Sequence, residues 1–224
     1  MKLSIIMPVL NEAAGTEAAL RALGSLRERG VELIVVDGGS GDGTAELARP
    51  LADRVLSAPR GRAMQMNSGA AAAKGDALLL LHADTRLPQD ADQLVLDGLN
   101  DRQWGRFNVR FDGGGLLRLV AIMMNTRSRL TGIATGDQAM FMRRAAFEQA
   151  GGFPPIALME DIALSARLKR LGRPLCLAAR VTTSGRRWRR HGLWRTILLM
   201  WGLRLRYFLG ADPARLARAY GYEN

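Results

Sequence analysis

The sequence predicts an α/β fold with a mostly parallel central sheet and helices on both of its faces. Three short, nearly continuous apolar runs carry this prediction, at residues 3–7, 33–36 and 78–81. Runs without apolar–polar alternation are typical of strands that are buried on both faces, as in parallel sheets. Helical stretches separate the runs, and this order of strand and helix favours right-handed crossovers.

Glycines and polar groups mark the expected elements of the first hundred residues. Thr16 is a candidate cap for a first helix that Gly30 closes. Four glycines among residues 37–44 make a loop whose backbone can approach a ligand closely. The other elements expected here are a short edge strand at 55–57, a helix at 63–74, the leucine strand at 78–81 and a helix at 88–99.

The second half has a different pattern. Phe107, Val109 and Phe111 alternate with polar residues, which predicts a strand with one wet face. Further elements are expected as a helix at 116–130, a strand at 139–142, a helix from Asp161 to 171 and a strand at 175–181. Residues 193–209 mix apolar and aromatic side chains with three arginines, which predicts an amphipathic helix. We favour packing of this helix on its own domain or a partner subunit over contact with a membrane interface.

Size and composition fit one globular domain over residues 1–224. The chain is 48% hydrophobic and 24% charged, and it is long enough to bury a sizeable core. Cys176 is the only cysteine, so no disulfide can form within the chain, and we expect a cytoplasmic location. No apolar stretch reaches the roughly 18 residues of a membrane span, and the N-terminal run is too short for a signal peptide.

The net charge of +11 is concentrated near the C-terminus. Residues 173–224 contain eleven arginines and two acidic residues, whereas residues 1–172 contain 21 basic and 19 acidic residues. Such a block can face nucleic acid, phosphorylated substrates or anionic lipid. The run at 186–190 is either a grip for a diphosphate or a solvated or lipid-facing surface.

Carboxylates follow the apolar strands. Asp37 and Asp84 come directly after the second strand and the leucine strand, and Glu12 follows the first strand. Ligands of open α/β sheets bind beyond the carboxyl ends of the strands, so we expect these groups to converge there. They suit a ribose, a base edge or a divalent cation, although each alone can also be a turn residue or a helix cap.

Other candidates stand at the starts of helices. Arg60 and Arg62 flank a glycine and form either an anion cradle or a solvated pair. Glu160 and Asp161 either cap a helix or supply a general base. His82 either contacts a ribose or phosphate or has a structural role.

Together these motifs resemble those of family 2 glycosyltransferases, and they cover residues 3–172 in the family's order. The matching segments are Pro8 to Glu12, Val35 to Thr44, His82-Ala83-Asp84 at the Asp-x-Asp position, Gly136-Asp137, and Met159-Glu160-Asp161. The short length, with His-Ala-Asp-Thr, Gly-Asp-Gln-Ala and Ser-Gly-Arg-Arg-Trp, is most similar to a bacterial branch associated with radical-SAM, selenium-related or arsenosugar pathways.

The resemblance implies a GT-A fold and an inverting enzyme with a divalent metal, Mn²⁺ or Mg²⁺. The enzyme would move a sugar from a UDP- or GDP-linked donor to a hydroxyl or other nucleophile of an unidentified acceptor. Residues 1–100 would bind the nucleotide sugar, and residues 101–185 would form the acceptor and catalytic half. Apart from the resemblance, the basic amphipathic segment at 186–224 is a candidate for peripheral membrane contact, as the alternative to packing, and no nucleic-acid partner is expected.

The resemblance also assigns roles to individual residues. The donor would be bound by Pro8, Glu12, Asp37, Arg62, His82 and Asp84. Asp84 would also hold the metal, and Arg186 and Arg187 would bind the diphosphate. On the acceptor side, Gly136 and Asp137 would shape the pocket. Asp161, beside Glu160, would deprotonate the acceptor hydroxyl.

Two departures from the family pattern concern the metal. His82 replaces the first aspartate of Asp-x-Asp. Many GT-A enzymes carry a late metal-binding histidine, for which His191 is the one candidate, at a poor spacing. Arg186 or Arg187 would then replace its function electrostatically.

Two other functions are alternatives to sugar transfer. A sugar nucleotidyltransferase would need a loop rich in glycine and basic residues after the first strand, and residues 8–12 do not provide it. A non-catalytic protein could bind nucleic acid or anionic membrane through the basic segment. Paired carboxylates at the sheet edge would repel phosphates unless a metal were present, which argues against that alternative.

Overall fold

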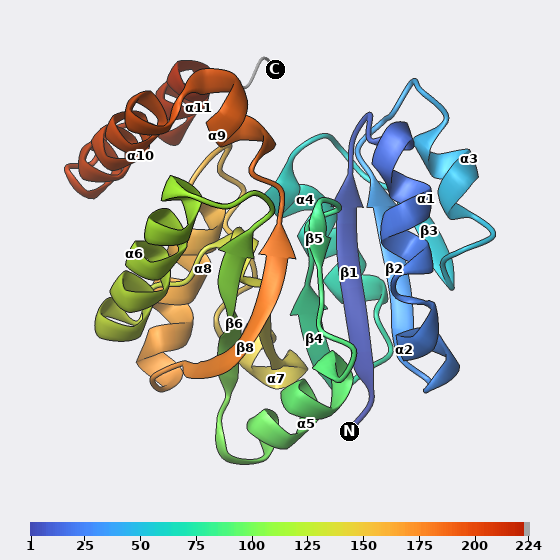
Figure 1. Ribbon diagram of the computed structural model, residues 1–224. Coiled ribbons are helices and arrows are strands. Elements are labelled where there is room, and N and C mark those ends of the chain that lie inside the picture. The colour runs from blue at the N-terminus through green and yellow to red at the C-terminus, as the bar shows by residue number, and fades with distance from the viewer. Residues whose placement is uncertain (222–224) are drawn as a thin grey trace.

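An eight-stranded sheet runs through the computed structural model, which describes residues 1–221, so residues 222–224 of the expected C-terminal segment lie outside it. The strand order is β3-β2-β1-β4-β7-β6-β8-β5 (Figure 1). The strands are β1 (Leu3–Val9), β2 (Glu32–Asp37), β3 (Arg54–Ser57), β4 (Ala77–Leu80), β5 (Thr85–Arg86), β6 (Trp104–Phe111), β7 (Met140–Arg143) and β8 (Leu175–Thr183). Strands β1 to β4 are parallel, and so are β6 and β8, which confirms the mostly parallel sheet.

Helices cover both faces of this sheet. They are α1 (Ala13–Arg21), α2 (Gly24–Glu28), α3 (Thr44–Ala48), α4 (Arg62–Ala72), α5 (Ala91–Asp101), α6 (Leu116–Thr131), α7 (Arg144–Gln149), α8 (Glu160–Leu168), α9 (Arg186–His191), α10 (Leu193–Phe208) and α11 (Pro213–Tyr220), with 3-10 turns η1 (Gly136–Gln138) and η2 (Lys169–Leu171). Leu79 of β4 packs in the core cluster of α1, α2 and α5. Leu78 and Leu80 pack in the cluster of α4, α7 and α8 on the other face. Each fully buried leucine contributes about 1.5–3 kcal/mol, so the leucine strand is a major part of both cores.

Strand β7 runs antiparallel to both of its neighbours, β4 and β6. Leu78 pairs with Met142 and Leu79 with Phe141 in this register. Because β7 is reversed, its beginning lies at the edge where the parallel strands end. The turn η1, which precedes β7, is therefore brought to the loop that follows β4.

Three expectations about local structure were wrong. Thr16 does not cap the first helix but lies inside α1, where its hydroxyl donates to the Glu12 carbonyl at 2.8 Å. The single helix expected there is two helices, α1 and α2. Strand β6 is wet only near its end, because α6 covers Arg106, which donates to Ser128 Oγ at 3.2 Å and to the Asn125 carbonyl at 3.1 Å.

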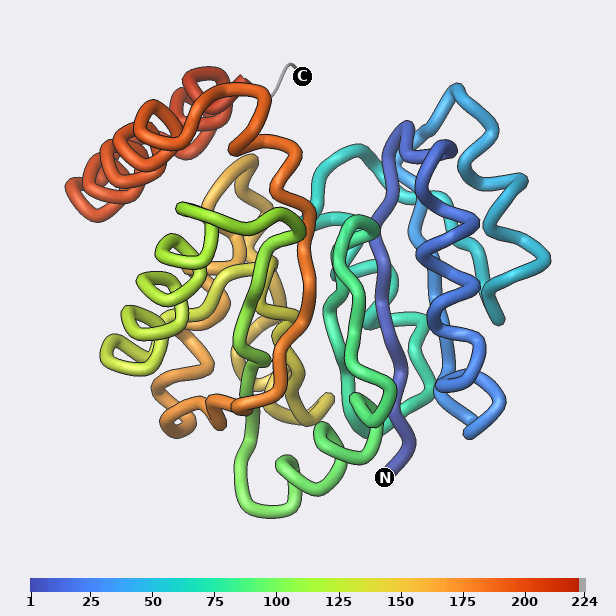
Figure 2. The backbone as a smooth tube through the Cα atoms, in the orientation of Figure 1, coloured from blue at the N-terminus to red at the C-terminus, as the bar shows by residue number. Residues whose placement is uncertain are grey.

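The C-terminal helices α9, α10 and α11 follow β8 and lie beside α6 (Figures 1 and 2). One face of α10 packs as expected: Leu203 is 2% exposed and belongs to a core cluster with Leu216 of α11 and Ile162 of α8. The opposite face does not pack. Its large apolar residues are 58–68% exposed, and they are Trp194, Leu198, Trp201, Leu205 and Phe208. We call these five residues the α10 stripe.

Candidate active site

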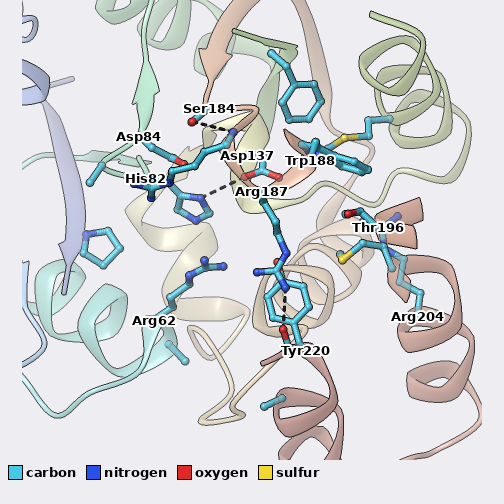
Figure 3. Close-up of a pocket in the computed structure, with 18 of the residues that line it drawn as sticks. Arg62, His82, Asp84, Asp137, Ser184, Arg187, Trp188, Thr196, Arg204 and Tyr220 are labelled. Carbon is cyan, nitrogen blue, oxygen red and sulfur yellow. Dashed lines mark hydrogen bonds and ion pairs between the residues drawn. The ribbon is translucent and has the colours of Figure 1, made fainter. Parts of the chain in front are cut away.

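A cavity of about 1420 Å³ lies at the edge where the parallel strands end. Segments after β1 and β4 and the start of α4 form one side, and α6, α9, α10 and α11 form the other (Figure 3). Most of the residues that the sequence singled out line it, namely Pro8, Glu12, Arg62, His82, Asp84, Asp137, Arg186 and Arg187. The topology therefore gathers residues that are up to 179 positions apart in the chain, Pro8 and Arg187.

The carboxylate of Asp84 enters this cavity directly after the leucine strand. The next residue, Thr85, belongs to β5, and its hydroxyl bonds the Thr183 hydroxyl of β8 at 3.0 Å. The Thr85 hydroxyl also lies 3.4 Å from Asp84 Oδ1. Pairing of β5 with β8 thus fixes the backbone beside Asp84, while the Asp84 residue itself is exposed.

Asp37 has a different environment from the other two strand-end carboxylates. It is 5% exposed and does not line the cavity. Its Oδ2 accepts hydrogen bonds from the backbone of Gly39 at 3.0 Å and Ser40 at 2.9 Å, so it organises its own glycine-rich loop. Glu12 does line the cavity, and its Oε1 lies 3.5 Å from Arg186 Nη2.

Gln65 is a lining residue that sequence reasoning missed. It is 3% exposed, and its Nε2 donates to the carbonyls of Val9 and Val36, each at 2.8 Å. The side chain therefore ties α4 to the ends of β1 and β2. A polar residue on the buried face of an alanine-rich helix is the signal that could have identified it.

His82, Gly136 and Asp137 form a tight group at the junction of β4 and η1. His82 Nδ1 lies 3.5 Å from Asp137 Oδ1, a contact that is an ion pair when the imidazole is protonated (Figure 3). A Cβ at Gly136 would lie 2.4 Å from His82 Nε2, so a larger residue there would displace the imidazole. Burial favours a raised pKa for Asp137, but hydrogen bonding to His82 and the charges of His82, Arg62 and Arg204 outweigh it, so the pKa is lowered.

Glu160 and Asp161 begin α8 and line a second, small cavity of about 10 Å³ rather than the large one. Asp161 Oδ2 accepts from the Gly136 backbone at 2.8 Å, and its Oδ1 accepts from Ile162 at 2.7 Å. Burial, together with the Asp161 charge, raises the pKa of Glu160 to about 7, although Arg62 at 4.0 Å opposes the shift. Arg62 and His82 line both cavities, so side chains rather than backbone separate them.

The two predicted diphosphate-binding arginines differ in how firmly they are held. Arg187 donates from Nη2 to the Tyr220 carbonyl at 2.7 Å, and its guanidinium lies 3.6 Å from the centre of the Tyr220 ring (Figure 3). Burial raises the pKa of Tyr220, and Arg187 opposes that shift. The Arg186 side chain is 68% exposed, and its contact is the ion pair with Glu12. His191 is exposed and does not line the cavity.

The far side of the cavity is apolar and was not anticipated from the sequence. Its α6 and α10 residues include Ile122, Met123, Ile197, Met200 and Trp201. Two arginines, Arg127 of α6 and Arg204 of α10, lie among them. These residues belong to amphipathic helices. The spacing of apolar residues along each helix does not show that a cavity lies between the two helices.

A metal would have a limited set of protein ligands here. Within residues 1–221, no group of three or more His, Cys, Asp and Glu side chains is placed to hold an ion. Mg²⁺ and Mn²⁺ are commonly held by one or two carboxylates together with substrate phosphates and waters. Asp84, with His82 and Asp137 nearby in the same cavity, fits that pattern.

Across the described part of the chain, none of the helices has the length and apolar character needed to cross a membrane.

The sequence matches the family model described as Glycosyl transferase family 2 over residues 4–149. It is 28% identical to Probable glycosyltransferase YdaM of Bacillus subtilis (strain 168), covering 76% of this chain and 47% of that protein. It is also 28% identical to the undecaprenyl-phosphate 4-deoxy-4-formamido-L-arabinose transferase of Pseudomonas paraeruginosa (strain DSM 24068 / PA7), covering 62% of this chain and 45% of that one. The chain thus spans about half the length of these curated relatives.

Solved structures share the fold at low sequence identity. The mannosyltransferase PcManGT of Pyrobaculum calidifontis, in complex with GDP-Man and Mn²⁺, has a TM-score of 0.65 and 21% identity, covering 99% of this chain and 69% of that one. Residues 1–349 of S. aureus TarS, in complex with UDP-GlcNAc, have a TM-score of 0.65 and 18% identity, covering 82% and 58%. These neighbours establish the GT-A fold.

Proposed function

This chain belongs to glycosyl transferase family 2, and we propose that it transfers a sugar, with inversion, from a UDP- or GDP-linked donor to a nucleophile on the acceptor. The observation that carries the proposal is the convergence of Glu12, Arg62 and Asp84 on one large cavity at the carboxyl edge of the sheet. The solved relatives in complex with UDP-GlcNAc and GDP-Man support a nucleotide-sugar donor. The motifs around His82 and Gly136 support the bacterial branch associated with radical-SAM, selenium-related or arsenosugar pathways.

We assign the donor to the half of the cavity built from residues 1–100. Pro8 and Glu12 would contact the nucleoside, and Asp37 would act indirectly by holding the glycine-rich loop in shape. Arg62, Arg186 and Arg187 would face the diphosphate, for which the planar guanidinium is well suited. Residues 101–185 would then supply the acceptor side, with Gly136 and Asp137 at the boundary.

Asp84 would hold a divalent cation, together with the donor phosphates. When bound, such a cation neutralises negative charge on the departing nucleotide diphosphate. The arginines around the cavity would hold the same phosphates in place and complement that charge. The Mn²⁺ in two related structures supports this assignment in general terms.

Asp161 would act as the general base. Its carboxylate is fixed by two backbone N–H groups, and it lies behind Arg62 and His82, which line both cavities. Rotation of either side chain would connect Asp161 to the acceptor. Glu160, whose pKa is raised to about 7, stands beside it at the start of α8 and would be the second candidate for this role.

One set of measurements tests this function. Calorimetry with UDP and GDP should show Mn²⁺-dependent binding to the wild type, weakened about tenfold or more in Asp84→Ala and unchanged in Asp97→Ala, an exposed carboxylate on α5. Donor turnover should be lost in Asp161→Asn, whose donor affinity should be retained. Full turnover in Asp161→Asn would refute the base assignment, and equal Mn²⁺-dependent affinity in Asp84→Ala would refute the metal site.

We also propose that the protein contacts a membrane surface peripherally through α10. The α10 stripe combines exposed tryptophan, leucine and phenylalanine, which suits the interface between lipid headgroups and acyl chains. The basic excess of residues 173–224 favours anionic lipid as the partner.

A further inference from the structure

The buried amide of Gln65 is fixed at the point where β1 and β2 end. Its Nε2 donates to the carbonyls of Val9 and Val36, each at 2.8 Å, and the residue is 3% exposed. Only the NH2 group of an amide can donate to a carbonyl, and both of its hydrogens are used here. The two hydrogen bonds therefore fix which way the amide is turned, since a flipped amide would direct its oxygen at two carbonyl oxygens.

The segment that follows β2 also holds the amide in place. A Cβ at Gly38 would lie 3.1 Å from Cδ, Nε2 and Oε1 of Gln65 alike, so the Gly38 backbone lies against the flat face of the amide. The Gly38 N–H donates to the Val9 carbonyl at 3.0 Å, and this is the same oxygen that accepts from Gln65. Hydrogen bonds and packing thus both oppose rotation of the amide.

The amide oxygen of Gln65, Oε1, accepts no hydrogen bond from residues 1–221. It is not one of the fully buried polar atoms in that part of the chain that lack a partner, so it reaches accessible surface. The surface that Gln65 lines is that of the large cavity, which Pro8 and Leu10 also line. The protein therefore presents to this cavity a hydrogen-bond acceptor whose orientation is already fixed.

Asp37, the carboxylate expected to bind the donor at the end of β2, uses its oxygens elsewhere. Its Oδ2 accepts from the backbone of Gly39 and Ser40, and its Oδ1 accepts from the Ser40 hydroxyl. Asp37 pairs with Val9 in the sheet, so Gln65 and Asp37 approach the same strand ends, one from α4 and one from the glycine-rich loop. Of these two side chains, Gln65 is the one that lines the cavity.

We propose that Gln65 selects the nucleobase of the donor, by accepting a hydrogen bond from a ring N–H group. This rests on the proposed function, which places a nucleotide sugar in the cavity. Uracil carries such a donor at N3 and guanine carries one at N1, whereas the corresponding ring nitrogens of cytosine and adenine are acceptors. A cytosine or adenine nitrogen would face the Gln65 oxygen with no proton between them, and the fixed amide cannot turn to offer its NH2 group.

The test compares nucleoside diphosphates that differ at this ring nitrogen and at the exocyclic group beside it, with Mn²⁺ present throughout. Calorimetry on the wild type should show that UDP binds about tenfold or more tightly than CDP, or GDP than ADP, as expected for one unmatched hydrogen bond in a buried site. The pair that shows this preference identifies the base. A wild type without a preference in either pair would overturn the proposal.

Gln65→Met shows whether the amide is the source of the preference. The affinity for the preferred nucleotide should fall about tenfold or more, whereas the affinity for CDP or ADP should stay the same or rise, because the unmatched oxygen is gone. Gln93→Met, at an exposed glutamine of α5 outside the cavity, should keep the wild-type preference. Thermal unfolding identifies a variant that is not folded. N3-methyl-UDP or N1-methyl-GDP then tests the wild type, where blocking the N–H should lower affinity to about that of CDP or ADP.

Each contrary result has a distinct meaning. Equal losses of both nucleotides of a pair in Gln65→Met would show that the residue only holds the strand ends, and would overturn base selection. Asp37→Asn should weaken both nucleotides alike, because it loosens its own loop. Loss of the preference in Asp37→Asn, with its retention in Gln65→Met, would assign the base to Asp37 instead. Absence of all nucleotide binding would overturn base selection together with the proposed function, whereas nucleotide binding without a preference would overturn base selection alone.

Discussion

At the scale of single residues, the site depends on the absence of a side chain at Gly136. Replacing it with alanine would place a Cβ 2.4 Å from His82 Nε2, so the imidazole must turn away from its position beside Asp137. We expect Gly136→Ala to lower kcat/KM about tenfold or more, because displacement of a positioned group by about 1 Å has effects of that size or larger. Gly15→Ala is the control, since nothing lies within 4 Å of the added carbon. Equal activity in the two variants would show that the position of His82 does not matter.

Glu160 should make stability depend on pH. Its pKa rises from 4.5 in the unfolded chain to about 7 in the folded protein, so the folded state binds more protons between these values. Stability should therefore fall as pH rises from about 4.5 to 7 and level off above that range. The contribution is on the order of 3 kcal/mol. In urea unfolding, Glu160→Gln should lack this decline, and a parallel decline in both proteins would exclude Glu160 as its source.

The sequence identified candidate site residues by their type and by their place in a motif. These predictions succeeded where the residue follows the end of a strand, because the strand fixes its position. Asp84 and Glu12 line the large cavity as expected, whereas Asp37 lies outside it and accepts hydrogen bonds from its own loop. Gln65, Arg127 and Arg204 were missed, since their relevance comes from tertiary neighbours rather than from local pattern.

At the scale of elements, Arg144 holds the C-terminal end of α4 from a distant part of the chain. Its guanidinium donates to the carbonyls of Ala70 at 3.1 Å and Gly75 at 2.8 and 2.9 Å, and also to that of Ala73. We expect Arg144→Met to lower the free energy of unfolding by about 2–4 kcal/mol, because several buried carbonyls lose a charged donor. Chemical denaturation measures this, with Arg102→Met, an exposed arginine, as the control. A loss below that of the control would contradict the capping role.

The same scale shows what periodicity can and cannot predict. Apolar runs located β1, β2 and β4, and helical spacing located α6 and α8, because burial on a given face leaves its mark on the local sequence. Strand direction leaves no such mark. The reversal of β7, which brings Gly136 and Asp137 to the site, follows from pairing with β4 and β6 and could not be read from residues 139–142.

At the scale of the whole molecule, the α10 stripe gives the protein one strongly apolar exposed face. The protein should bind vesicles containing phosphatidylglycerol and release from them as salt is raised, because its basic residues attract anionic headgroups. The double variant Leu198→Ser/Leu205→Ser should bind about tenfold less in sedimentation, through loss of buried apolar area. Leu47→Ser, at an exposed leucine of α3, should bind normally. A dimer in light scattering that the double variant abolishes would instead assign the stripe to a second copy of the chain.

The pairing of β5 with β8 has a consequence for synthesis on the ribosome. Thr85 and Arg86 follow Asp84 immediately, but their strand partners are Thr183 and Thr182, almost a hundred residues later. N-terminal segments generally fold first as a chain emerges. The first half of the sheet can therefore assemble early, while the strand that follows Asp84 has no partner until residues 182–183 have been made. The nascent chain would acquire this pairing only after β8 has been made.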